Sequence, residues 1–372
     1  MKNETLCVHE GTRRDKATGG VNSPIYTSSA CEYIGRDRQS YPRYFNQPNQ
    51  EAVVAKICAL EGAEGGVLFA SGMAAISTTL LALCPPGAEI VMQSEVYGGT
   101  DAFLTEHLIP QGFSCQRAGT SAEAIIEACS AETKVIYIET PTNPLLSVVD
   151  IRAVATFARS NGILTIIDNT FATPILQTPL ALGIDVVVHS GTKYFGGHAD
   201  MSSGIAVAST ELADKIRARA KLLGGNLNAQ DCYLLERSLK TLALRVERQS
   251  ANAGQLALWL ESAPGVARVH YPGLVSSPYH EIAKAQMRDF GAMLSFELAS
   301  TTAATFMGRL KLICPALSLG GVETTICAPA ETSHLYLSDE AREEIGISEG
   351  LLRLSVGIEN VDDLISDIAG AL

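Results

Sequence analysis

The stretch Val186-Val187-Val188-His189-Ser190-Gly191-Thr192-Lys193-Tyr194 decides how the rest of this 372-residue chain is interpreted. The β-branched run that ends at Val188 is typical of a buried parallel strand. A turn of small residues follows, and open α/β sheets bind their ligands at such turns. Lys193 there could form a Schiff base with an aldehyde cofactor while Ser190 and Thr192 hold the cofactor's phosphate. The alternative is an ordinary surface lysine, because most lysines are exposed.

A second apolar strand, Ile163-Leu164-Thr165-Ile166-Ile167, ends at Asp168. A carboxylate in that place can keep the ring nitrogen of pyridoxal phosphate (PLP) protonated, so that the ring draws charge from a substrate carbon. Aspartate after a strand is also a common helix cap. The spacing between Asp168 and Lys193 fits two strands with a short connection, so the two stretches favour one joint site.

Composition narrows the class of protein. The net charge is −12, and no cluster of Lys and Arg occurs, so we expect neither nucleic acid nor a membrane surface as a partner. No apolar run reaches the roughly 20 residues of a membrane span, and the polar start of the chain lacks a signal core. Nine cysteines without a CxxC pair or zinc spacing predict reduced thiols, no metal and a cytoplasmic location.

The apolar patterns alternate along the chain, which predicts a mostly parallel sheet covered by helices. Strands are expected near residues 67, 89, 134, 163, 184 and 204, and helices over 51–61, 150–161 and 228–261, the last as two helices or one bent helix. Further strands are expected near 266–270, 291–298 and 351–356, with helices near 279–287 and 361–371. We therefore expect an extended N-terminal arm (1–47), a large cofactor-binding domain (48–248) and a small C-terminal α/β domain (249–372).

Two segments carry a family resemblance. Asp168-Asn169-Thr170-Phe171-Ala172-Thr173-Pro174 and His189-Ser190-Gly191-Thr192-Lys193-Tyr194 resemble the PLP signature of the Cys/Met-metabolism enzymes. That family includes cystathionine γ-synthase, cystathionine γ- and β-lyases, methionine γ-lyase and homoserine-ester sulfhydrylases. The resemblance extends from Pro24-Ile25-Tyr26 to Arg353-Leu354-Ser355-Val356-Gly357. It implies the PLP-dependent transferase fold type I, which is aspartate-aminotransferase-like, α/β and mostly parallel, with a smaller C-terminal domain.

The resemblance also implies the roles of residues around the cofactor. Lys193 would be the catalytic lysine, Asp168 would face the ring nitrogen, and Ser190, Thr192 and Thr170 would lie beside the cofactor. Tyr97 would stack on the ring and assist proton transfer. Gly72 and Met73, at a strand-to-helix junction, would give backbone N–H groups to the phosphate, as helix N-termini do.

The resemblance also implies which residues contact the substrate. Asn143, between two prolines, would contact the PLP ring oxygen or the substrate carboxylate, and the Ser318 loop could bind a carboxylate. Arg353 lies inside an apolar strand. A buried arginine requires a partner, so Arg353 is either paired within the protein or held for an anion. In the family it grips the substrate α-carboxylate.

The resemblance implies that the arm contacts a neighbouring subunit. Tyr41 and Arg43 would reach the phosphate of a neighbouring subunit's PLP, since an Arg fork suits a dianion. The alternative is a solvent-facing arginine. The family's usual Arg-Ser-Gly-Asn-Pro-Thr is replaced by Arg43-Tyr44-Phe45-Asn46-Gln47-Pro48-Asn49, and we expect the bulky Tyr44 and Phe45 at the mouth of the neighbour's site. A homodimer is the expected minimum, and the family commonly forms a tetramer.

The distal pocket should select the substrate. Cystathionine-handling enzymes usually place a glutamate where this chain has Leu317 and often an arginine where it has Ala102, whereas methionine γ-lyases have a cysteine at the position of Gly99. A buried Leu317 cannot pair a charged ammonium. We expect α,γ-elimination on a methionine, homocysteine or cystathionine-type amino acid. The alternatives are a γ-replacement transferase that uses a homoserine ester and a thiol, and a non-catalytic relative.

Overall fold

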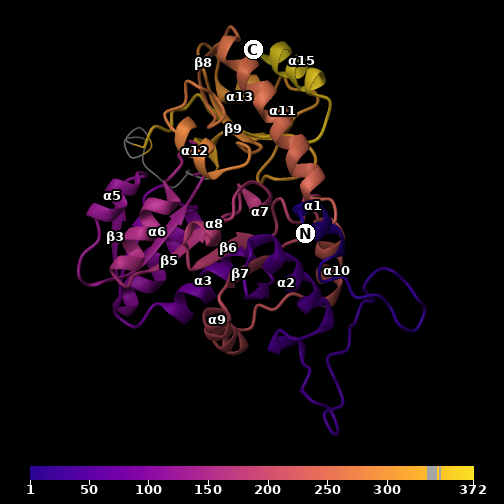
Figure 1. The fold of residues 1–372 in the computed structure, drawn as a ribbon. Coiled ribbons are helices and arrows are strands. Elements are labelled where there is room, and N and C mark those ends of the chain that lie inside the picture. The colour runs from indigo at the N-terminus through magenta and orange to yellow at the C-terminus, as the bar shows by residue number, and fades with distance from the viewer. Residues whose placement is uncertain (333–341, 343–344) are drawn as a thin grey trace.

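The computed structural model describes residues 1–332, 342 and 345–372 (Figure 1). Its strands form two sheets, one of seven strands and one of five. The seven-stranded sheet consists of β1 (Gly65–Phe69), β2 (Glu89–Gln93), β3 (Ser114–Ala118), β4 (Thr133–Glu139), β5 (Leu164–Asp168), β6 (Val186–Ser190) and β7 (Gly204–Ala208). The five-stranded sheet consists of β8 (Val266–His270), β9 (Met293–Leu298), β10 (Cys314–Pro315), β11 (Thr325–Cys327) and β12 (Leu351–Ser355).

The first part of the chain contributes the helices α1 (Asn3–His9), α2 (Pro48–Glu61), α3 (Gly72–Leu83), α4 (Gly98–Ala102), α5 (Ala122–Glu127), α6 (Ile151–Ser160), α7 (Thr173–Leu176) and α8 (Pro179–Leu182). The second part contributes α9 (Thr210–Leu223), α10 (Ala229–Leu239), α11 (Leu242–Ser262), α12 (His280–Gln286), α13 (Ala303–Met307) and α15 (Val361–Ala371). Short turns of other helix types are η1 (Pro42–Tyr44), η2 (Phe103–Leu108), η3 (Ile109–Gln111) and η4 (Pro329–Glu331). None of the helices in these described ranges is both long and apolar enough to cross a membrane.

The large sheet has the order β1-β7-β6-β5-β4-β2-β3. β7 pairs antiparallel with both β1 and β6, and the other neighbours are parallel. The predicted mostly parallel sheet is therefore confirmed. β3 was missed because it is an edge strand whose side chains are largely exposed, so it lacks an apolar run.

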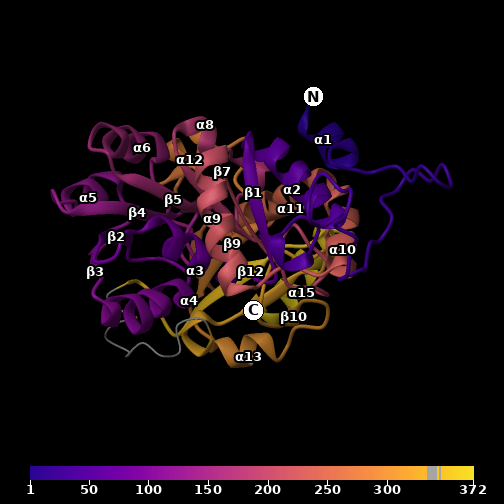
Figure 2. The same cartoon turned by 90° about the horizontal axis from the view of Figure 1, so that it is seen from below.

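Each face of the large sheet carries its own hydrophobic core, because side chains alternate along a strand. In β1, Leu68 packs in one core with residues of α2 and α6. Its neighbours Val67 and Phe69 pack in the other core with residues of α3 and α9. In Figure 2, α6 lies on one side of β4 and β5, and α3 lies on the other. This layering leaves the carboxyl ends of β4, β5 and β6 at one edge.

The five-stranded sheet has its own core with α11, α13 and α15. Helix α11 begins beside the large sheet and extends to this second core, as Figure 1 shows. The expected helical region 228–261 is two helices, α10 and α11. The expected domain boundary near residue 248 falls within α11.

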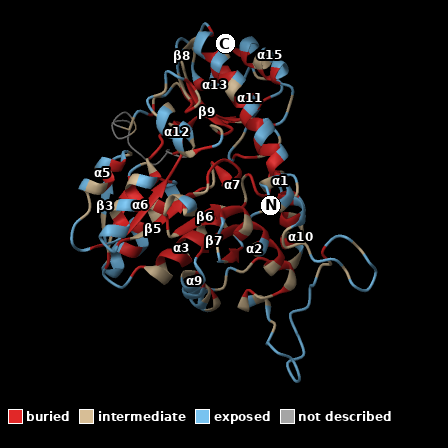
Figure 3. Cartoon of the chain, viewed as in Figure 1, coloured by how far each residue is buried: buried red, intermediate tan, exposed pale blue. Residues whose placement is uncertain are grey.

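The N-terminal region is only partly extended. Residues 10–41 contain no helix or strand and lie along the outside of the molecule, where Figure 3 shows mainly exposed residues. Residues 3–9, however, form α1, which packs on α2 and α11 of the same chain. The fully buried Lys56 donates to the Cys7 carbonyl at 2.8 Å. A cation at a helix C-terminus is stabilising, and this tertiary contact explains a helix that the local pattern does not indicate.

Candidate active site

A cavity of about 460 Å³ lies at the carboxyl edge of the large sheet, next to the Ser318 loop and β12. We call it the lysine cavity. The predicted residues that line it are Gly72, Met73, Tyr97, Asn143, Asp168, Thr170, Ser190, Thr192, Lys193, Leu317, Ser318 and Arg353. Segments far apart in sequence thus converge on one site, and of the predicted site residues Tyr41 and Arg43 do not line it.

Lys193 follows β6, and its Nζ donates to Ser318 Oγ at 2.8 Å. Burial lowers the pKa of Lys193 to about 8, and the nearby positive charge of Arg353 acts in the same direction, while Asp168 opposes it. An amine with this pKa can exchange a proton near neutral pH. The turn after β6 thus places a lysine with a lowered pKa in the cavity.

Asp168 ends β5 and is 6% exposed. Burial raises the pKa of Asp168, while the Thr170 hydroxyl and N–H, which both donate to Oδ1, act against that rise. Thr170 Oγ1 in turn accepts the Ser190 N–H at 2.8 Å. Thr170 therefore joins the end of β5 to the end of β6 and fixes Asp168 relative to the turn that carries Lys193.

The start of α3 forms one wall of the cavity and has the features of an anion site. Ser71 caps the helix, since its hydroxyl accepts the Ala74 N–H at 3.1 Å. A Cβ added to Gly72 would lie 2.8 Å from the Ser190 side chain, so only glycine permits this approach. The free N–H groups of a helix N-terminus and the hydroxyls of Ser190 and Thr192 together fit a phosphate group.

Arg353 lies in the central strand β12 and is 6% exposed. Its guanidinium donates to Asn143 Oδ1 at 2.8 Å and to the Ser318 carbonyl at 3.1 Å. Its Nε is buried without a partner, and within the described ranges no carboxylate pairs with it. Of the two alternatives for this arginine, the geometry therefore fits a guanidinium held for an anionic ligand.

Two details at the cavity mouth concern the substrate. Leu317 was expected to be buried, and this is wrong: it is 69% exposed, because the loop turns sharply at Ser318, whose φ is 76°. Tyr97 is 48% exposed, and its ring lies so close to Gly99 that a Cβ there would come within 2.5 Å of the ring. A cysteine at position 99 would displace Tyr97 from this position.

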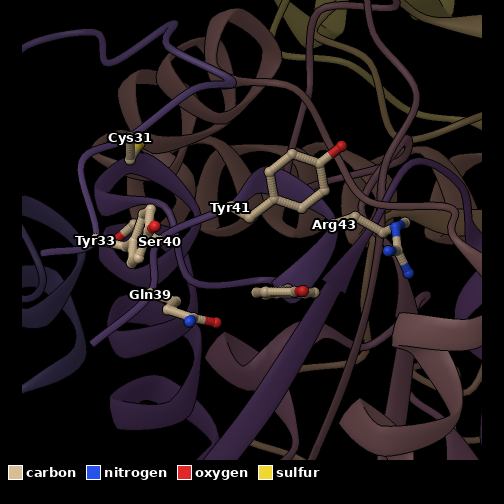
Figure 4. Close-up of a pocket in the computed structure, with 7 residues that line it drawn as sticks. Cys31, Tyr33, Gln39, Ser40, Tyr41 and Arg43 are labelled. Atoms are coloured by element: carbon tan, nitrogen blue, oxygen red, sulfur yellow. The ribbon is translucent and has the colours of Figure 1, made fainter.

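Tyr41 and Arg43 line a separate pocket with Cys31, Tyr33, Gln39, Ser40 and Tyr44 (Figure 4), which we call the arm pocket. The Arg43 guanidinium lies 5.8 Å from the centre of the Tyr41 ring and donates to the Lys221 carbonyl. Phe45 was expected at the mouth of a site, but it is buried against Phe69 at 5.6 Å between ring centres. Its left-handed backbone turns it into the core.

Sequence reasoning missed Glu139. This carboxylate ends β4, lines the lysine cavity, pairs in register with Asp168 and accepts the Tyr97 N–H at 2.9 Å. Burial and the neighbouring Asp168 raise the pKa of Glu139 well above its usual range. The signal was available, because Glu139 follows an apolar strand just as Asp168 does.

The site and its two-sheet scaffold define a PLP-dependent enzyme of fold type I. A model of the family described as Cys/Met metabolism PLP-dependent enzyme matches residues 4–372, so the chain belongs to this family, whose cofactor is PLP. A cystathionine β-lyase from Lactococcus lactis subsp. cremoris is 44% identical over 99% of this chain and 98% of that protein. A cystathionine γ-lyase from Bacillus subtilis is 44% identical over 100% of this chain and 99% of that protein.

A solved structure supports the same assignment. The crystal structure of cystathionine γ-lyase from Lactobacillus plantarum, complexed with L-serine, superposes with a TM-score of 0.95. It is 41% identical and covers 100% of this chain and 98% of its own chain. The aspartate-aminotransferase-like fold expected from the PLP signature is therefore confirmed.

Proposed function

We propose that this enzyme is a carbon–sulfur lyase that catalyses α,γ-elimination on methionine, homocysteine or a cystathionine-type amino acid. The products would be 2-oxobutanoate, ammonia and a thiol, with one water consumed. The observation that carries the proposal is the position of Lys193 and Arg353 in one cavity: a proton-transferring amine lies beside an arginine that has no carboxylate partner in the described ranges. An α-amino acid offers an α-proton for the amine to remove and an α-carboxylate for the arginine to bind.

The proposed roles follow from these contacts. Bound PLP supplies an electron-withdrawing ring that stabilises negative charge on the substrate α-carbon. Arg353 binds the substrate α-carboxylate, and Asn143 orients that guanidinium. Lys193 Nζ removes the α-proton and carries it onward, and Ser318 Oγ positions the amine.

The remaining contacts hold the cofactor. Asp168 holds a proton on the ring nitrogen, while the α3 N-terminus with Ser190 and Thr192 binds the phosphate. Tyr97, which lines the cavity, would stack on the ring. The close approach of Gly72 to Ser190 supports this proposal, because it brings the Ser190 hydroxyl next to the N-terminus of α3.

The distal end of the cavity suits an uncharged substrate tail. Leu317 lies at the rim and offers no partner to an ammonium group. Ala102, where the family often has an arginine, does not line the cavity. Because Leu317 is exposed, water can still solvate a charged tail, so cystathionine is disfavoured rather than rejected. The same apolar rim suits an O-acyl homoserine, and it therefore supports γ-replacement with a thiol as the second candidate.

A substrate screen tests the proposal. Purified enzyme is incubated with methionine, homocysteine or cystathionine without added thiol, and the 2-oxo acid is identified by mass spectrometry. The proposal predicts 2-oxobutanoate, whereas β-elimination of cystathionine would give pyruvate. Product that forms only when an O-acyl homoserine and a thiol are both present would contradict the lyase and support the transferase.

We further propose that the active site is shared between subunits of a cytoplasmic homo-oligomer, at least a dimer and a tetramer by family resemblance. In this assembly Tyr41 and Arg43 would complete the phosphate site of a neighbour. The exposed arm pocket supports this, since Arg43 contacts only a backbone carbonyl and two rings in its own described chain. The free state of all nine cysteines is compatible with a reducing compartment.

A further inference from the structure

A buried acid–base pair lies behind the lysine cavity without lining it. Glu61, the last residue of α2, is 1% exposed, and His189, in β6, is 2% exposed. His189 Nε2 and Glu61 Oε1 are 2.7 Å apart. The imidazole also packs against Phe195, with ring centres 4.6 Å apart. None of the roles assigned so far uses either group.

This pair is connected to both strand ends that build the site. Glu61 Oε1 also accepts the Asn169 side-chain N–H at 3.0 Å, and Asn169 directly follows Asp168. His189 directly precedes Ser190 in β6. Glu61 Oε1 therefore contacts two residues that flank the site. Asn169 is next to Asp168, which is proposed to face the ring nitrogen, and His189 is next to Ser190, which is proposed to bind the phosphate.

The charge on Glu61 is unfavourable for stability by itself. It lies at the C-terminal end of a helix, where the backbone already carries partial negative charge. Its second oxygen, Oε2, is buried and has no partner in the ranges that the structure describes. A glutamine could accept the same two hydrogen bonds without burying a charge. Packing alone therefore does not explain why this position carries a carboxylate.

A positive charge on His189 would affect Asp168 directly. Glu139 and Asp168 are adjacent buried carboxylates that compete for one proton. A charged His189 lowers the pKa of Asp168, whereas the contacts of Glu139 leave the pKa of that group strongly raised. A charge on the imidazole would thus favour the arrangement in which Glu139 holds the proton and Asp168 holds the charge.

We propose that Glu61 is a positioning residue: its carboxylate fixes the His189 imidazole and the Asn169 side chain, so that Asp168 stays aligned to face the pyridine nitrogen of PLP. This inference rests on the role proposed for Asp168. Glu61 acts through two contacts: its hydrogen bond with His189 fixes the imidazole within β6, and its hydrogen bond with Asn169 fixes the position of the segment that follows β5.

The test is E61Q, which keeps the hydrogen bonds and removes the charge. Its control is E236Q, because Glu236 is likewise buried (2% exposed), also has a buried oxygen without a partner in the described ranges, and contacts Ser23 rather than the site. Three quantities are measured: the PLP dissociation constant of the apoprotein, the visible spectrum of the bound cofactor, and kcat and KM. A melting curve of each apoprotein monitors folding.

The inference predicts that E61Q weakens PLP binding and lowers kcat by about tenfold each, the scale typical of groups that orient a ligand residue. KM and the apoprotein melting temperature should stay close to wild type, and the visible spectrum should change. E236Q should match wild type in all cofactor measurements. H189Q should repeat the effect of E61Q, and the double variant should add little to it.

E61Q and H189Q could instead have a lower melting temperature with unchanged PLP affinity and spectrum. That result would show that the pair only stabilises the fold, and it would overturn the inference. If E61Q does not fold, H189Q alone decides by the same measurements. Failure of the proposed function is distinguishable. It would show as wild-type enzyme that binds PLP but forms no 2-oxo acid, whereas failure of this inference leaves wild-type activity intact.

Discussion

The lysine cavity and the arm pocket were both predicted to hold cofactor contacts, yet they are built differently. The walls of the lysine cavity come from segments between Ser71 and Arg353, and its charged groups are largely buried. The arm pocket is formed by one local segment, residues 31–44, and Tyr41 is 41% exposed there. The proposed ring and carboxylate contacts therefore all lie in one cavity of a single chain, whereas Arg43 lies in a separate pocket, and its proposed phosphate contact is with a second chain.

The strongest effect should come from the part of the lysine cavity that binds substrate. We expect Arg353→Ala to raise KM about a hundredfold, because loss of the carboxylate anchor misplaces the α-carbon relative to Lys193. PLP affinity should change little. Steady-state kinetics and PLP titration measure the two effects separately. Arg353→Lys is the matched control and should recover only part of the loss, since an ammonium lacks the bidentate fork. An unchanged KM would contradict the anchor.

A substitution in the arm pocket should have a smaller effect, and it should change PLP affinity rather than KM. We expect Arg43→Ala to weaken PLP binding about tenfold, the factor that corresponds to about 1.4 kcal/mol, with KM nearly unchanged. Equilibrium dialysis of the cofactor is the measurement. Arg38→Ala, which removes an arm arginine paired with Glu51, is the control and should keep PLP affinity.

Mixing an inactive variant with one that binds PLP weakly tests whether the two pockets cooperate across subunits. Lys193→Ala and Arg43→Ala chains are refolded together, and activity is compared with that of each variant alone at limiting PLP. If sites are shared across a two-fold axis, random dimers should regain about a quarter of the intact sites. Activity no higher than the average of the two separate variants would show that Arg43 serves its own chain.

The pH dependence of PLP capture tests the electrostatics of the lysine cavity. Only the neutral amine of Lys193 can attack the aldehyde, and burial brings its pKa down to about 8. The rate at which apoprotein captures PLP should therefore rise about tenfold from about pH 7 to about pH 9 and then level off. Stopped-flow absorbance is the measurement. A rate that keeps rising to pH 10 would indicate an unshifted lysine.

The smallest effect is expected at the rim. Leu317→Glu should shift kcat/KM toward cystathionine by up to about fivefold, because an exposed charge pair contributes only about 0.2–1 kcal/mol. Leu317→Gln, which adds length without charge, is the control. If the wild type and the Glu variant have equal selectivity, the residue at position 317 does not determine substrate specificity.

Features that depend on local sequence patterns could be predicted from the sequence, whereas features that depend on tertiary packing could not. Asp168 and Lys193 were found because each follows a buried strand, and strand ends meet at one edge of a parallel sheet. Glu139 has the same pattern but was missed because it lies outside the two signature segments. The exposure of Leu317 and the contact between Lys193 and Ser318 depend on how the two sheets face each other, which local patterns do not encode. Likewise, α1 forms through tertiary contacts such as that of Lys56.

The most direct test of the central claim is borohydride reduction of the purified enzyme followed by peptide mass spectrometry. Reduction fixes any imine between a lysine amine and the cofactor aldehyde. The account predicts a pyridoxyl group on the peptide that contains Lys193, and none in the Lys193→Ala protein. A label on another lysine, or an unlabelled Lys193 in protein that has taken up PLP, would contradict it.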